Sequence, residues 1–90
     1  MQKQVLNYRI IIEPEKHGRK TVYNAACPTL GVYDYGDSID EVLKSIKDGI
    51  ELALEYLTEE GKEIPVDNLK NQTVTTTEVD VPEGAKVSFA

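Results

Sequence analysis

Apolar and polar residues alternate in the first third of the chain, as they do in strands that bury one face. This alternation predicts a first strand over residues 5–13, and similar patterns predict further strands over 21–27 and 32–35. Residues 14–20 are polar and contain proline and glycine, so they predict a hairpin loop. The expected core side of the first strand holds Leu6, Tyr8, Ile10 and Ile12. Three strands in this order favour an antiparallel meander.

The pattern changes to a helical period after residue 38. A capping box predicts the helix start, because Ser38 can accept from the amide of Glu41 while the Glu41 carboxylate reaches back to the amide of Ser38. Gly61 provides the left-handed residue that commonly ends a helix, so we expect a helix over residues 39–60. Its apolar positions fall within an arc of about 120°, and we expect them in the core. They are Ile39, Val42, Leu43, Ile46, Ile50, Ala53, Leu54 and Leu57.

The C-terminal segment is rich in threonine and valine. Residues 73–81 predict a fourth strand, with a slip in parity that favours a bulge or pairing of only the second half. Residues 82–85 predict a turn, and residues 86–90 a last short strand or a loose end. The chain is therefore expected to be one α+β domain over residues 1–70, with residues 71–90 as a strand or hairpin extension of it.

Charge narrows the classes of partner. The 90 residues include 10 lysines and arginines against 16 acids, for a net charge of −6, which argues against binding to phosphate backbones. The first 36 residues hold five bases and three acids, and the remainder five bases and thirteen acids. A solvated helix face explains most of this asymmetry, but an acidic surface also complements a basic protein.

Nothing in the sequence predicts export or membrane insertion. No apolar run approaches the roughly 18 residues of a membrane span, and the start lacks a signal-peptide pattern. Cys27 is the single cysteine, so no internal disulfide can form, and a reducing cytoplasm is the expected location.

Few residues predict catalysis. Glu13, Asp34, Asp37 and Asp40 are candidates for binding a divalent ion, as in a metal-dependent nuclease, but a strand end, solvent and a helix N-terminus explain them much better. His17 lies in the polar loop and Cys27 at the far end of the return strand, so a thiol–imidazole pair is not expected. From these residues together we predict no enzyme activity and no cofactor.

A stripe of residues runs beside the predicted core arc of the helix. Ser45 and Gly49 leave room for close approach, and Leu52 and Tyr56 lie one turn apart. A glycine inside a helix costs roughly 1 kcal/mol relative to alanine, so the space it leaves has a use. Either the core extends further round the helix, or the stripe is a contact surface.

Three motifs resemble the HicB-type antitoxin family and a group of small uncharacterised proteins that share its N-terminal domain. They cover about two thirds of the chain. They are the opening Tyr8-Arg-Ile-Ile-Ile-Glu13, the turn Cys27-Pro-Thr-Leu-Gly31 followed after four residues by Gly36-Asp-Ser-Ile-Asp-Glu41, and Gly61-Lys-Glu-Ile-Pro65. The resemblance implies a partial ribonuclease H-like βββαβ fold without the acidic catalytic cluster, in which an antiparallel meander sheet packs against one long helix.

The resemblance also implies a function. Family members block a small basic mRNA-cleaving toxin of the HicA type and assemble into homodimers or higher homo-oligomers. Many carry a C-terminal DNA-binding segment, for which this chain has no room after Pro65, so no direct DNA binding is expected. At the toxin interface we expect the acidic Asp48, Glu51 and Glu55, with Leu52 and Tyr56 as apolar anchors. The alternative is an orphan self-associating domain with a structural or regulatory role.

Overall fold

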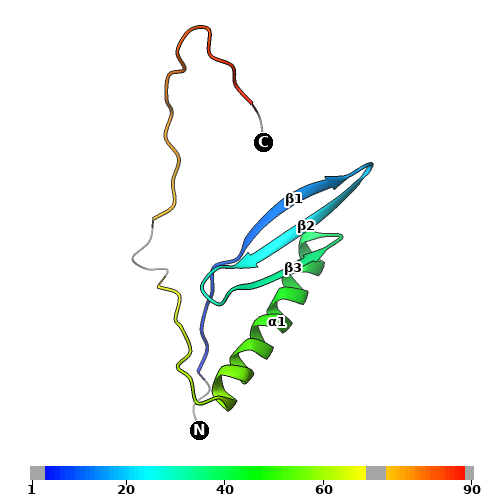
Figure 1. Cartoon of the computed structure of the whole chain (residues 1–90), viewed down its shortest axis with the longest axis vertical. Coiled ribbons are helices and arrows are strands. Elements are labelled where there is room, and N and C mark those ends of the chain that lie inside the picture. The colour runs from blue at the N-terminus through cyan, green and yellow to red at the C-terminus, as the bar shows by residue number, and fades with distance from the viewer. Residues whose placement is uncertain (1–3, 69–72, 89–90) are drawn as a thin grey trace.

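The sheet and the helix form two layers. The structure, a computed structural model, describes residues 4–68 and 73–88. Strands β1 (Ile11–His17), β2 (Lys20–Cys27) and β3 (Val32–Gly36) are followed by helix α1 (Ile39–Glu59). The strands pair antiparallel in the order β1-β2-β3, and α1 crosses one face of the sheet (Figure 1). The predicted α+β class and the meander are confirmed.

The β1–β2 hairpin differs from the prediction at both ends. The strands continue through the expected loop until His17 pairs with Lys20, and the turn is only Gly18-Arg19, with Gly18 at φ 65°. A glycine with positive φ at the first central position is typical of a type II′ turn. Pro14 is compatible with β1 because this strand lies at a sheet edge. Residues 5–10, predicted as the start of the strand, form no ladder.

Local signals set the ends of α1. Ser38 Oγ accepts from the Glu41 amide at 3.1 Å, as predicted. The Glu41 carboxylate accepts from the amide of Asp37, one residue before the predicted donor. At the other end, Gly61 adopts φ 67°, and the Lys62 amide donates to the Leu57 carbonyl at 2.9 Å. This 6→1 bond is the Schellman arrangement that ends many helices.

The core is small and lies between α1 and the β2–β3 half of the sheet. Its buried residues are Ala25, Cys27, Val42, Ile46 and Ile50, with Ile12, Tyr23, Val32 and Leu54 among the partly buried side chains around them. Ile39 and Leu43 belong to the predicted apolar arc but remain 49% and 42% exposed. The flank of the helix that carries Leu43 is therefore incompletely covered.

The predicted fourth strand is wrong. Residues 73–81 have no strand structure and are exposed throughout, so the described architecture is βββα rather than βββαβ. The segment runs away from the sheet and helix (Figure 1), and the Cα radius of gyration is 17.8 Å, against about 12 Å for a compact chain of this length. A strand needs a hydrogen-bonding edge as well as an alternating pattern, and residues 73–81 pair with neither of the two open edges, β1 and β3.

The turn predicted at residues 82–85 is confirmed by the bond from the Ala85 amide to the Pro82 carbonyl at 3.1 Å. Residues 86–88 form no strand, and residues 89–90 lie outside the described residues. Across the described part of the chain, no helix is long and apolar enough to cross a membrane.

Candidate functional site

The second half of the helix carries an exposed apolar pair. Leu52 and Tyr56 are 67% and 55% exposed, although helices of small proteins usually bury such residues. They border a shallow hollow of about 580 Å³ between α1 and the β2–β3 turn. The hollow is lined by Leu30, Gly49, Leu52, Ala53, Glu55, Tyr56, Leu57 and Glu59. Three of the five predicted interface residues, Leu52, Glu55 and Tyr56, therefore share one surface.

The other two predicted residues lie outside this hollow. Asp48 is exposed one helical turn before Leu52, so it borders the same face. Glu51 lies further round the helix, where it lines a separate groove beside residues 4–10. Glu51 also lines a shallow groove together with Glu55 and Glu59, so these acidic side chains are neighbours along α1, and the role of all five residues in binding a partner stays a prediction. Leu30, which completes the hollow, belongs to the Cys27–Gly31 turn motif, but the sequence did not predict its position beside α1.

The small-residue half of the stripe packs inside the protein. Ser45 Oγ donates to Asp34 Oδ2 at 2.5 Å, which links α1 to β3. A Cβ added at Gly49 would lie 3.3 Å from Val32 Cγ1. The interpretation that the core extends further round the helix is thus correct for Ser45 and Gly49, and the interpretation of the stripe as a contact surface stays a prediction for Leu52 and Tyr56. The core extends to Ser45 and Gly49, while Leu52 and Tyr56 remain exposed.

Charge surrounds the apolar pair. Glu55 and Glu59 line the hollow itself, and Asp48 lies beside it. Lys62 Nζ lies 5.9 Å from the centre of the Tyr56 ring, which is within cation–π range. Tyr56 thus already contacts a cation through its ring face, and the flanking carboxylates favour a basic partner.

The carboxylates proposed for a metal site do not converge. Glu13 of β1 pairs with Asn24 of β2, and Asp34 of β3 pairs with Ala25, the next residue of β2. Because consecutive residues of a strand face opposite sides of the sheet, the carboxylates of Glu13 and Asp34 lie on opposite faces. Asp37 forms an ion pair with Lys20 at 3.1 Å. Within residues 4–68 and 73–88, no group of three or more His, Cys, Asp or Glu residues has a metal-binding arrangement. The geometry does not support the nuclease alternative.

Asp34 has a structural role instead. The hydrogen bond from Ser45 and, second, the one from the Tyr35 amide lower the pKa of the Asp34 carboxyl. The Tyr35 amide lies 2.8 Å from Asp34 Oδ1. The carboxylate is held at the helix–sheet contact by donors from both layers.

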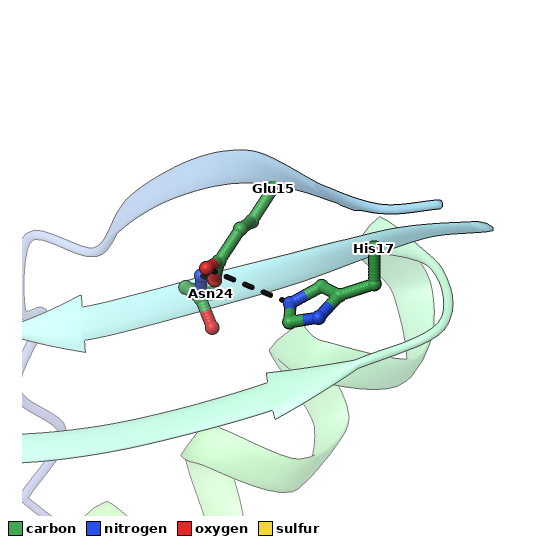
Figure 2. A network of polar contacts seen from close by, with 3 residues as sticks. All are labelled: Glu15, His17 and Asn24. Carbon is green, nitrogen blue, oxygen red and sulfur yellow. Dashed lines mark hydrogen bonds and ion pairs between the residues drawn. The ribbon is translucent and has the colours of Figure 1, made fainter. Parts of the chain in front are cut away.

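A polar network lies on the outer face of the β1–β2 hairpin, which is the face that α1 does not cover. Figure 2 shows the Glu15 carboxylate between Asn24 and His17. Asn24 Nδ2 donates to Glu15 at 2.6 Å, and His17 Nε2 lies 3.5 Å from the same carboxylate. The Asn24 hydrogen bond is the main cause, and His17 the second, of a lowered pKa of Glu15. The sequence did not predict this network, although a two-residue turn at Gly18 would have placed all three residues on one face.

His17 and Cys27 do not meet. His17 lies beside the hairpin turn and is largely exposed, whereas Cys27 is fully buried at the opposite end of β2. A thiol–imidazole pair is therefore absent, as the strand length predicts.

Comparison with known proteins places the chain in a family. It is 37% identical over 68 residues to a UPF0150 protein of Synechocystis sp., an alignment that covers 74% of this chain and 82% of the relative. No protein-family profile matches the chain, and no solved structure matches it. The alignment spans most of both chains, which is sufficient to identify the family. The chain therefore belongs to the UPF0150 family.

Proposed function

We propose that this chain is an antitoxin-type protein that binds and neutralises a small basic mRNA-cleaving toxin of the HicA type. It acts in the cytoplasm by protein–protein contact and without enzyme activity of its own. UPF0150 is the HicB-like family, which supports this assignment. The observation that carries it is the exposed Leu52–Tyr56 pair at the acidic hollow of α1.

Two physical features suit this surface to a basic partner. Leucine and tyrosine side chains next to a hollow provide apolar anchors that a partner can cover. Asp48, Glu55 and Glu59 around them attract a basic protein and accelerate its association. A toxin that cleaves RNA needs a basic surface to hold phosphates, so an acidic protein bound there competes with the substrate.

The test measures binding to a small basic toxin of the HicA type. We expect a 1:1 or higher complex at micromolar concentration and loss of RNA cleavage in its presence. Tyr56→Ala is expected to raise the dissociation constant about 30-fold, which is the effect of losing a hot spot of about 2 kcal/mol. Raising salt from 50 to 500 mM is expected to slow association by about tenfold.

The matched control is Tyr33→Ala, because Tyr33 is 74% exposed on the outer face of the sheet, which α1 does not cover. This variant is expected to bind normally. Equal weakening by Tyr33→Ala and Tyr56→Ala, or no complex at low salt, would contradict the proposed surface.

A further inference from the structure

An open groove exposes one side of the core. It lies between residues 4–10 and the Leu43 flank of α1, and Ile64 lines it too; its volume is about 710 Å³. Ile46 and Ile50 also line the groove, although they belong to the buried core. With only a small core beneath it, a chain of this size gains much from covering these side chains. The groove is therefore an incomplete part of the fold.

The unpaired C-terminal segment has the pattern of a strand that buries one face. Thr75, Thr77, Val79 and Val81 share one parity, while Glu78 and Asp80 take the other. Val79 and Val81 are 75% and 58% exposed. An amphipathic strand without a partner is not stable in water, so this face requires an apolar surface to pack against.

Charge favours the groove over the other exposed surface. The outer face of the sheet carries Tyr33 and Tyr35, but Glu13 and Glu15 line the same hollow and repel an acidic strand. Lys47 lines the groove beside α1. Among the described residues, the one acid that lines the groove is Glu51. An acidic segment is therefore repelled less by the groove than by the outer face of the sheet, and Lys47 attracts it.

The path of the chain directs this segment out of its own groove. The Tyr8 hydroxyl donates to the Pro65 carbonyl at 2.6 Å, and the Arg9 amide donates to Asp67 Oδ2 at 2.8 Å. Residues 65–67 therefore run in the same direction as residues 8–9, toward β1. To enter its own groove the following segment would have to reverse, whereas in Figure 1 residues 73–81 continue away from the helix.

We propose that residues 75–81 of one copy of this chain lie in the groove of a second copy. Val79 and Val81 pack against Leu43 and Leu54 of that copy, and the exchange is reciprocal, so each dimer fills two grooves. The groove and the Leu52–Tyr56 hollow lie on opposite flanks of α1. Self-association therefore leaves the proposed toxin surface open and does not depend on it.

Disulfide trapping between two full-length variants tests the exchange. Leu43→Cys and Val79→Cys chains are mixed and oxidised with glutathione disulfide, and the product is read on a non-reducing gel. Native Cys27 is 0% exposed and does not compete. We expect a mixed disulfide at twice the 10.0 kDa chain mass, in at least tenfold greater yield than for Leu43→Cys mixed with Val74→Cys. Val74 lies on the opposite parity and is the matched control.

Two further measurements complete the test. The double variant Leu43→Cys/Val79→Cys is expected to give linked dimers, and a disulfide within a single chain would overturn the proposal in favour of the chain's own tail. Sedimentation is expected to show that the parent chain is a dimer. The double substitution Val79→Asp/Val81→Asp should raise the dimer dissociation constant at least 100-fold, whereas Val74→Asp should leave it unchanged. The helix content of both variants should equal that of the parent. A monomeric parent chain at 100 µM, or equal yields with both cysteine partners, would refute the exchange.

Discussion

The hydrogen bond between Ser45 and Asp34 links α1 to β3, and its removal should destabilise the whole fold. Ser45→Ala deletes the donor but leaves Asp34 with the Tyr35 amide. A hydrogen bond to a charged group contributes about 1.5–3 kcal/mol. Because the pair is only part-buried and one donor remains, we expect a loss of about 1 kcal/mol, since solvent screens exposed charges. For a domain of this size that lowers the melting temperature by about 4–8 °C.

The same bond makes the loss depend on pH. The hydrogen bonds lower the pKa of Asp34 in the folded chain, below a value of about 3.9 in the unfolded chain. A carboxyl with a depressed folded-state pKa adds stability that is present above the unfolded value and is lost as the pH falls through the folded value. The difference in the free energy of unfolding between the parent and Ser45→Ala should therefore have its full value at pH 7 and shrink below pH 4.

Urea unfolding at pH 7 and at pH 2.5, followed by circular dichroism, measures both effects. Thr58→Ala is a suitable control, because Thr58 Oγ1 donates only to the Leu54 carbonyl within the same helix. Its effect should not change between the two pH values. An equal loss for Ser45→Ala at both pH values, or no loss at pH 7, would refute the role assigned to the Asp34 carboxylate.

Three other substitutions test the local structure. Gly36→Ala should destabilise the fold by about 1–3 kcal/mol, because the new Cβ would lie 3.1 Å from the Val42 amide nitrogen; urea unfolding that shows no loss would contradict this close approach. Ser38→Ala should cost about 1 kcal/mol through the lost helix cap, and an unchanged thermal midpoint would show that the cap is dispensable. Asn24→Ala should raise the pKa of Glu15 toward its ordinary value, since the main hydrogen bond to that carboxylate is lost; an NMR titration that finds no rise would assign the shift to other groups.

Elements set by neighbouring residues were predictable from the sequence. The start and end of α1 depend on Ser38 and Gly61, which act within a few residues of themselves. The hairpin was harder, because Pro14 and the polar residues after it resemble a loop, whereas an edge strand tolerates both. The prediction of a fourth strand was wrong because alternation identifies a strand-like segment but not the sheet edge to which that segment pairs.

The candidate site shows the same division. Helical angle alone predicts that Leu52 and Tyr56 lie together and at the margin of the core. It does not predict that Ser45 and Gly49 are covered, since this depends on Asp34 and Val32 of β3, and strand placement is a long-range property. Leu30 was missed for the same reason.

The division of the helix stripe also separates folding from recognition. Ser45 and Gly49 are constrained by contacts with the sheet, so substitution there changes stability. Leu52 and Tyr56 belong to no core cluster of the described residues, so substitution there changes the surface at little cost to the fold. Related chains can therefore diverge in partner by changing two positions of one helix while keeping the same scaffold, and a redesigned specificity would begin at those positions.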